Sequence, residues 1–257
     1  PPPPPGFPQF PSAPPPSYPA YVGDVPAGGF EPVGAGVAHH GILLYLIIAL
    51  QILLIPGEIS LRSKALKFLN DELSFTSFKD AMERQQSFMA FQSAFTLAVA
   101  ILTMIWMGKM MRNHRRLGRP GSKWRPGWAI GAWFVPPGAI YAVPWLILKE
   151  LWRGSDPANT PGDPNWRNRP VSPLVHLWWA LYGFVPLLGL VLTSVTLSPR
   201  LNMGFGAEVD ARDAADLYTD LFWVQILMAL ASIASAVTFA LLVRRLSERQ
   251  TALWGGY

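Results

Sequence analysis

Residues 41–56 read GILLYLIIALQILLIP, a stretch with no charged side chain and a single amide, Gln51. With the four residues before it, the stretch forms an apolar block over 37–56. A helix needs about 20 such residues to cross a hydrocarbon core about 30 Å thick. Of the 257 residues, 51% are apolar and 14% are charged, whereas roughly a quarter are charged in soluble domains. The sequence therefore predicts an all-α membrane helix bundle.

Further apolar blocks of similar length follow along the chain. They cover residues 88–111, 128–148, 174–197 and 221–243. The first of these lies inside a longer helical pattern that runs from Ser77, a residue type that caps helix starts, to His114. Residues 58–86 mix charged and apolar side chains, which predicts an amphipathic segment next to the membrane.

The last two blocks carry features that predict how their helices pack. Trp178 and Trp179 predict an aromatic pair at the membrane interface, and Pro186 predicts a kink. The final block has small side chains at spacings of three and four, which favour close contact between helices in lipid. These small residues are Ala229, Ser232, Ala236 and Ala240.

The block over 128–148 is predicted not to cross the membrane, because the loops on both of its sides are basic. Residues 109–125 contain seven basic and no acidic side chains, and residues 149–169 contain four basic and three acidic ones. Residues 200–220, by contrast, contain two basic and five acidic ones. Short basic loops stay in the cytoplasm. The block is therefore predicted to enter and leave on the same face, which leaves four transmembrane helices.

This re-entrant hairpin is expected to have two arms of about ten residues each. The prolines and the glycine assigned to it are Pro136, Pro137, Gly138 and Pro144. Broken backbone inside a membrane is tolerated only where protein or a wet cavity covers it. We therefore expect the four spanning helices to surround the hairpin.

The basic loop predicts both topology and a class of ligand. Its position against an apolar block favours topology control and contact with anionic lipid headgroups over nucleic-acid binding, although the formal net charge is +5. The residues concerned are Lys109, Arg112, Arg115, Arg116, Arg119, Lys123 and Arg125. With this loop inside, we expect a multi-pass protein of the bacterial plasma membrane with both termini cytoplasmic.

Residues 1–36 are rich in proline and have neither helical nor strand periodicity, which favours extended polyproline II conformations. A disordered tether fits this composition, and so does an arm that a partner surface holds through aromatic anchors. Those anchors are Phe7, Phe10, Tyr18, Tyr21 and Phe30. The predicted domains are therefore a proline-rich cytoplasmic arm over 1–36, a helix bundle over 37–250 and a C-terminal tail over 251–257.

Residues that carry chemistry are sparse, and we expect no enzyme activity, no metal and no cofactor. The lack of cysteine excludes disulfides, thiolate metal sites and cysteine nucleophiles. Neither the adjacent His39 and His40, which would point about 100° apart on a helix, nor the isolated His114 and His176 form a metal-binding pattern. Glu150 and Arg153 are three residues apart and favour an ion pair on a helix face over an acid–base role. Three amides in the spans are expected to form hydrogen bonds between helices. They are Gln51, Gln92 and Gln225.

Several motifs stand out between Met107 and Pro157. They are Leu117-Gly118, the run from Arg125 to Gly131, the run from Trp133 to Pro136, Pro144, and the run from Glu150 to Arg153. In these motifs the chain resembles the family of domain of unknown function 4328, found in actinobacterial membrane proteins. Two positions depart from the family pattern, since Ala139 stands where the family usually has Asn and Trp145 stands where Tyr is common. The resemblance implies a multi-helix membrane domain and assigns no reaction.

Taken together, these features predict a non-catalytic accessory or scaffolding subunit of a larger bacterial membrane complex, with a respiratory or other electron-transfer assembly as one host. Such a subunit would dock through its helices and its proline-rich arm. Its partners would be other membrane protein subunits and anionic lipids, with no nucleic acid. The alternative is a small channel or transporter for neutral solutes, because a re-entrant hairpin resembles the architecture of pores. A third class, a membrane enzyme, is disfavoured by the lack of catalytic motifs.

Overall fold

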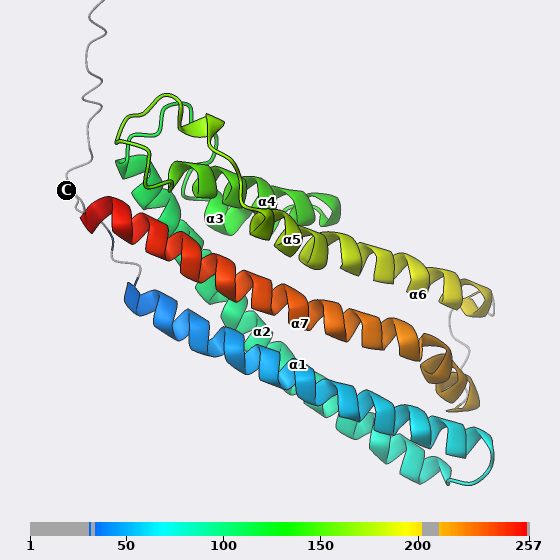
Figure 1. Ribbon diagram of the computed structural model, residues 1–257. Coiled ribbons are helices and arrows are strands. Elements are labelled where there is room, and N and C mark those ends of the chain that lie inside the picture. Colours follow the sequence, from blue (N-terminus) through cyan, green and yellow to red (C-terminus); the bar gives the residue numbers. More distant parts are fainter. Residues whose placement is uncertain (1–30, 32–33, 202–210, 256–257) are drawn as a thin grey trace, which may run out of the picture.

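The computed structural model describes residues 31, 34–201 and 211–255, which form an elongated bundle of long helices (Figure 1). Its elements are α1 (Gly34–Leu69), α2 (Phe75–Arg116), α3 (Trp128–Gly131), α4 (Pro137–Gly154), the 3₁₀ turn η1 (Trp166–Asn168), α5 (Pro173–Trp179), the π-helical turn η2 (Ala180–Phe184), α6 (Val185–Leu201) and α7 (Ala211–Gly255). Four helical segments are long and apolar enough to cross a membrane. The predicted all-α fold with four spanning helices is thereby confirmed.

Helix α1 continues well past its predicted end at Pro56, which lies inside the helix. Proline removes one backbone hydrogen bond, but a membrane offers no water to replace the remaining ones, so the helix is retained. Beyond the proline, Leu61 is buried in one apolar cluster with Phe78 of α2. The predicted amphipathic segment over 58–86 is thus the joined ends of two long helices rather than a separate element.

Helix α2 begins two residues before the predicted start. The cap is Ser74, whose side-chain oxygen accepts a hydrogen bond from the backbone N–H of Ser77 at 3.4 Å. Ser77, predicted as the cap, therefore lies in the first turn. At the other end the helix stops where Gly118 adopts a φ of 60°, and its N–H bonds to the carbonyl of Arg115 at 2.9 Å. A left-handed glycine after the last turn is a common helix terminator, which gives the Leu117-Gly118 motif a physical role.

The fourth apolar block folds as α5, η2 and α6 in direct succession. Pro186 predicts a kink in this block. The structure has a π-helical turn that ends two residues before Pro186, on its N-terminal side. Because proline has no N–H to donate to the preceding turn, a local change of helical pitch at this point is expected.

Helix α7 runs without interruption for 45 residues. The last apolar block, 221–243, occupies only its middle. The predicted boundary at residue 251 is wrong, because residues 251–255 continue the same helix and form no separate tail. The remaining two residues, 256–257, lie outside the part of the chain that the structure describes.

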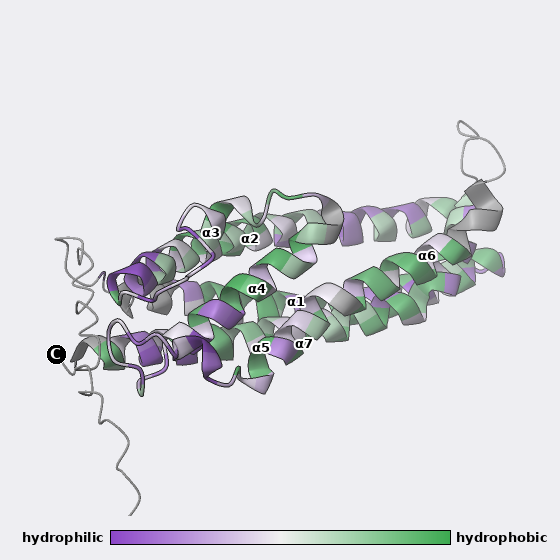
Figure 2. Cartoon of the chain, turned by 90° about the horizontal axis from the view of Figure 1, so that it is seen from above, coloured by the Kyte–Doolittle hydropathy of each residue, from purple (hydrophilic) through white to green (hydrophobic). Residues whose placement is uncertain are grey.

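Helix α7 packs along α1 and also contacts α6, while α2 packs against α1 (Figures 1 and 2). Gln51 of α1 donates a hydrogen bond to Ser232 of α7 at 3.2 Å, which confirms the interhelical role predicted for that glutamine. Gly189 of α6 lies so close to Met228 that an added methyl group would approach its sulfur to 2.5 Å. Small residues thus allow α6 and α7 to approach closely, as they do in other membrane bundles.

An aromatic core joins α5 to its neighbours. Trp178 is buried, stacks on Tyr182 with ring centroids 4.9 Å apart and contacts Phe239 of α7 at 5.2 Å. Trp179 stacks on Trp145 of α4 at 4.7 Å. Trp178 packs inward, because its large apolar ring fills space between the helices, while the level of the Trp178 and Trp179 pair in the membrane stays a prediction.

The middle block differs from the expected hairpin in two respects. Its first arm contains only α3, a helix of four residues, whereas α4 has 18 residues, so the arms are unequal. Both elements pack on one side of the bundle, α3 against α2 and α4 against α2 and α5. Phe134, between them, is 75% exposed. The expectation that four helices surround this element is therefore wrong, while re-entry into the membrane stays a prediction.

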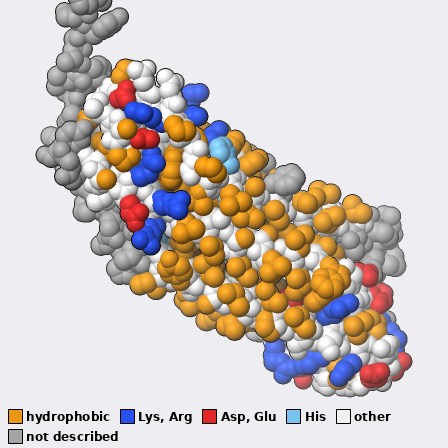
Figure 3. All heavy atoms as spheres, in the orientation of Figure 1, with side chains coloured by type: hydrophobic (Ala, Val, Ile, Leu, Met, Phe, Trp, Pro, Cys, Tyr) orange, Lys and Arg blue, Asp and Glu red, His pale blue; other side chains and the backbone are white. Residues whose placement is uncertain are grey.

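Charge and hydropathy divide the molecule along its length. Apolar side chains cover the middle of the bundle, and basic and acidic side chains gather at its two ends (Figure 3). One end contains the C-terminal ends of α2, α4 and α7 together with the loops 117–127 and 155–172, and we call it the basic end. The other carries the turn between α1 and α2 and the start of α7, and we call it the opposite end.

Candidate functional site at the basic end

Glu31 lies against the end of α2 and is held there by two arginines. Arg112 donates three hydrogen bonds to the Glu31 carboxylate at 2.8, 3.0 and 2.8 Å, and Arg116 lies 3.2 Å from it. The hydrogen bonds from Arg112 lower the pKa of Glu31 below its ordinary value. Forked contacts of this kind between guanidinium and carboxylate are among the strongest polar contacts in proteins.

The backbone of Glu31 is also bound. Its N–H donates to the side-chain oxygen of Asn113 at 3.1 Å, and its carbonyl accepts from the Asn113 side-chain nitrogen at 3.1 Å. Asn113 is fully buried and lies between the two arginines in sequence. We call the contacts of Arg112, Asn113 and Arg116 with Glu31 the arm-root contacts, because Glu31 lies three residues before the start of α1.

A buried polar chain connects the arm-root contacts to α7. Asn113 donates to Gln250 at 3.3 Å, and Gln250 in turn donates to the Met110 carbonyl at 3.1 Å and to Ser155 at 3.2 Å. Arg249, beside it, pairs with Asp156 at 2.9 Å. These hydrogen bonds satisfy the polar groups of an otherwise apolar helix junction, so the ends of α2, α4 and α7 form one connected structure.

Arg119 has a structural position that its predicted contact with lipid headgroups does not allow. It is 5% exposed and donates to the carbonyls of Gly154 at 2.9 Å and Thr160 at 2.6 Å. Its guanidinium thereby joins the end of α4 to the loop 155–172. The predicted contact with lipid headgroups is wrong for Arg119, because its guanidinium is buried against the end of α4 and the loop 155–172. Its predicted role in topology stays a prediction.

Arg112 and Arg116 also contact another part of the chain, because both form ion pairs with Glu31. The four other predicted basic residues remain accessible, since Arg115, Lys123 and Arg125 are exposed and Lys109 is half-buried. Contact of these four with lipid headgroups stays a prediction. The basic loop therefore divides into three residues that organise the protein and four that face outward.

Glu150 does not pair with Arg153 as predicted. Its carboxylate accepts hydrogen bonds from the Ser122 hydroxyl at 2.5 Å and from the backbone N–H groups of Lys123 at 3.1 Å and Trp124 at 3.5 Å. Arg153 instead donates to the carbonyl of Arg169 at 3.1 Å. Glu150 thus folds the loop 117–127 back onto α4, because successive backbone N–H groups form a natural site for an anion.

His114 lies beside this carboxylate in a fully buried position. Its ring is 3.9 Å from Glu150 and contacts Trp166 edge-on with centroids 5.1 Å apart. Neither ring nitrogen has a hydrogen-bond partner among the described residues. Gly154 lies directly over the ring, so that an added methyl group would approach it to 2.0 Å. The packing leaves no room for a ligand at His114.

Lys149 shows one effect of a departure from the family pattern. Its ammonium group lies 3.7 Å from the centroid of the Trp145 ring, and burial lowers the pKa of the lysine. Tryptophan binds cations over its face more strongly than tyrosine does. The indole at this position therefore offsets part of the cost of burying the Lys149 charge.

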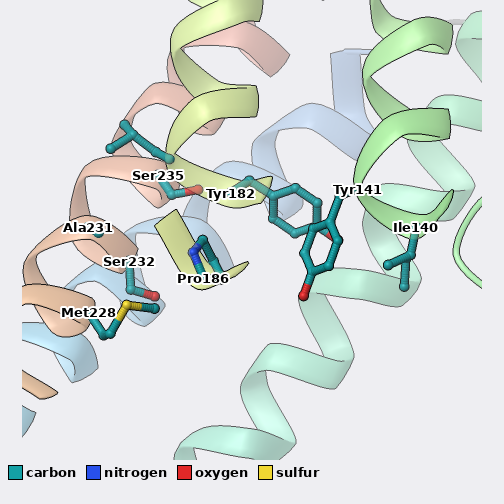
Figure 4. A pocket seen from close by; sticks show the side chains of 9 residues that line it. Ile140, Tyr141, Tyr182, Pro186, Met228, Ala231, Ser232 and Ser235 are labelled. Carbon is teal, nitrogen blue, oxygen red and sulfur yellow. The ribbon is translucent and has the colours of Figure 1, made fainter. Parts of the chain in front are cut away.

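The predicted hairpin residues lie near a cavity of about 300 Å³ between α4, η2 and α7. Tyr141 and Tyr182 form one wall, with ring centroids 5.8 Å apart, and Ser232 and Ser235 of α7 contribute hydroxyl groups to the other (Figure 4). The lining has no charged side chain. Of the hairpin residues, Pro136 is exposed, Pro144 is buried, and Pro137 and Gly138 begin α4. These residues lie at the start of α4 and within it, and none of them lines the cavity.

Three groups of predicted residues have a simple outcome. The aromatic anchors Phe7, Phe10, Tyr18, Tyr21 and Phe30 lie outside the described residues. His40 is buried and lies 3.0 Å from the Thr103 hydroxyl, which is a packing role. No group of three or more His, Cys, Asp or Glu side chains with the spacing of a metal site occurs within the described ranges.

Sequence reasoning missed Glu31 and Asn113. A usable signal existed, because Glu31 is followed by 26 residues, 32–57, that contain no Asp, Glu, Lys or Arg. An isolated carboxylate next to an apolar block, with a basic loop elsewhere in the chain, predicts an ion pair that joins the two.

Comparisons with known proteins support the resemblance in the motifs of the basic end. A sequence model of the family described as domain of unknown function (DUF4328) matches residues 70–248. The match includes α2 to α6 and most of α7, and covers more than half of the chain. No curated protein and no solved structure matches the chain. The chain therefore belongs to the family of domain of unknown function 4328.

Proposed function

We propose that this chain is a non-catalytic docking subunit of a larger bacterial membrane complex, with a respiratory or other electron-transfer assembly as one host. Its helices contact neighbouring subunits in the bilayer, and its proline-rich arm runs along a partner on the cytoplasmic side. The observation that carries the proposal is the set of arm-root contacts. They attach the segment before α1 to the end of α2 through both side-chain and backbone atoms of Glu31.

A fixed root favours binding by an extended arm. Ordering one residue costs roughly 1–2 kcal/mol of conformational entropy, and binding is weakened by every residue that must be ordered at the same moment. Attachment of Glu31 to buried Asn113 sets the position from which the arm leaves the bundle.

The orientation follows from the distribution of charge. The exposed Arg115, Lys123 and Arg125 lie at the basic end, and short basic loops remain cytoplasmic. We propose that the basic end, the arm and the C-terminal end of α7 are cytoplasmic. The exposed basic side chains then lie at the level of anionic lipid headgroups, which attract them.

The outward face of α2 is the second surface in the proposal. Phe91 is 55% exposed, Leu97 is 63% exposed and Ile101 is 48% exposed, because α2 packs mainly against α1. This face meets the bilayer or the helix of a neighbouring subunit. The proposed subunit role assigns part of it to a neighbouring helix.

Site-specific photocrosslinking in native membranes tests the proposal. A photoreactive residue at Phe10 of the arm is expected to form a product with one defined protein, and one at Phe91 with the same protein or another subunit of its complex. Glu31→Lys should lower the yield at Phe10, because it reverses the charge facing Arg112 and Arg116. The matched control is Glu248→Lys, which disrupts an exposed pair with Arg244 and should leave the yield unchanged. Products that contain only lipid or the chain itself contradict the proposal.

The cavity of about 300 Å³ favours one alternative function, passage or binding of a small neutral solute. Its hydroxyl-bearing, uncharged lining suits such a molecule better than an ion. In liposomes, this alternative predicts a flux that Ser235→Trp blocks by filling the cavity and that Ser194→Trp, on an exposed position of α6, leaves intact. The absence of flux across several classes of neutral solute removes the alternative.

A further inference from the structure

A second cavity, of about 270 Å³, lies between α1 and α2 toward the opposite end of the bundle. Lys64 of α1 and Arg84 of α2 line it from the two helices, together with the hydroxyl of Ser60. Leu53 and Phe88 line its other side. The cavity therefore has one cationic, hydrogen-bonding part and one apolar part.

The two parts follow the boundary of the apolar region. Residues 32–57 of the chain contain no Asp, Glu, Lys or Arg, and neither do residues 85–108. Leu53 and Phe88 lie within these uncharged stretches, whereas Lys64 and Arg84 lie beyond them. Because α1 and α2 are antiparallel neighbours (Figure 1), both helices pass from apolar to charged sequence at the level of the cavity. In a bilayer this is the level of the lipid headgroups.

The two cations have no counter-charge within the part of the chain that the structure describes. Neither Lys64 nor Arg84 has an ion-pair partner there. Glu58, which follows the cavity-lining Gly57, is buried and accepts a hydrogen bond from Gln85 at 2.7 Å. Gln85 lines the cavity and Glu58 does not, so the Gln85 amide lies between the Glu58 carboxylate and the cavity. Two basic side chains thus converge on one space without a protein anion to neutralise them.

Gly57 contributes the remaining space. A methyl group added there would approach the Gln85 side-chain oxygen to 2.4 Å, so any larger residue would displace the Gln85 amide. The glycine allows Gln85 to fold against α1 and pair with Glu58. The floor of the cavity is therefore set by the Gly57, Glu58 and Gln85 arrangement.

We propose that this cavity binds the phosphate of an anionic membrane lipid, with the headgroup between Lys64 and Arg84 and an acyl chain along Leu53 and Phe88. Lysine and arginine are the usual phosphate-binding side chains, and Ser60 adds a hydroxyl donor. A soluble phosphate has the same headgroup chemistry, but it would leave the apolar side of the cavity uncovered. The inference does not rest on the proposed docking role, because it concerns the opposite end of the bundle.

The test uses the full chain, purified in detergent and freed of lipid, with phosphatidylglycerol as the probe and native mass spectrometry to count bound lipid during a titration. The variant K64Q/R84Q should bind about tenfold more weakly, since a charge-assisted contact contributes enough free energy for a change of this size. The charge-keeping variant K64R/R84K should retain binding. The matched control is K67Q/K79Q, which also removes two positive charges from this end of α1 and α2, but at positions that do not line the cavity. This variant should bind lipid like the original chain.

Two results would overturn the proposal. Equal binding by K64Q/R84Q and the original chain would show that the cavity is not the anion site. Displacement of phosphatidylglycerol by inorganic phosphate at equal concentration would show that a soluble anion, and not a lipid, is the ligand. Thermal unfolding of each variant without lipid checks that the loss of binding does not come from loss of the fold.

Discussion

Replacement of Glu31 by Gln should loosen the arm root by an amount that the structure allows us to estimate. The change removes the charge that Arg112 and Arg116 bind but keeps the backbone of residue 31, which Asn113 holds. The carboxylate is 28% exposed and the Arg112 side chain is 44% exposed, so water screens the pair. We therefore expect a loss of about 1 kcal/mol, the upper range for pairs near the surface.

The assay is hydrogen exchange at the backbone N–H of residue 31, which donates to Asn113. A loss of 1 kcal/mol should raise its exchange rate roughly fivefold. Asn113→Ala removes two hydrogen bonds to the backbone of Glu31, each worth about 1 kcal/mol, and should raise the rate roughly thirtyfold. Glu248→Gln, which disrupts an exposed pair on α7, should leave the rate unchanged.

The effect of pH provides an independent check on the charge. The pKa of Glu31 is lowered from its ordinary value of 4.5 by the hydrogen bonds from Arg112. A lowered pKa means that the ion pair contributes fully above pH 4.5 and is lost as the pH falls through the folded-state pKa. The ratio of exchange rates between Glu31→Gln and the original chain should thus fall from about five toward one on acidification. An equal rate in both proteins at neutral pH would refute the role assigned to the charge.

Three further substitutions test the packing of the basic end by thermal unfolding in detergent. Gly154→Ala should destabilise the fold by about 2 kcal/mol, because the added methyl group meets His114, whereas Gly127→Ala, with open space around it, should change stability by less than about 0.5 kcal/mol. Arg119→Met should cost about 3 kcal/mol, since the carbonyls of buried Gly154 and of Thr160 both lose a charged donor. Glu150→Ala should cost about 2 kcal/mol, because three donors of the loop 117–127 lose their acceptor.

The spanning helices could be predicted from the sequence because lipid imposes a simple requirement. A block such as 221–243 is apolar over the length of a bilayer, and α7 contains it whole. The ends of the helices were predicted less well. Pro56 and the charges beyond it indicate the end of a span, yet α1 continues because Leu61 is buried against α2. The apolar composition of a block indicates where the chain leaves the membrane, whereas packing against neighbouring helices decides where the helix ends.

The candidate site was predicted only in part for a related reason. The density of basic residues in 109–125 is visible in the sequence. Which of them bind other parts of the chain, as Arg112, Arg116 and Arg119 do, is not. Arg119 is buried because the loop 155–172 folds over it, and this depends on contacts between residues far apart in the chain. The helical spacing of Glu150 and Arg153 predicts an ion pair, whereas the actual partners of Glu150 lie 26 to 28 residues earlier in the chain.

The measurement that tests the proposed docking role most directly is the native mass of the chain as it occurs in its own membranes. The chain is tagged at its natural expression level, extracted in mild detergent and weighed by native mass spectrometry. The account predicts a mass that exceeds one chain by whole partner subunits in fixed stoichiometry, and a loss of that excess when residues 1–30 are deleted. A mass equal to one chain with bound lipid, before and after the deletion, would contradict it.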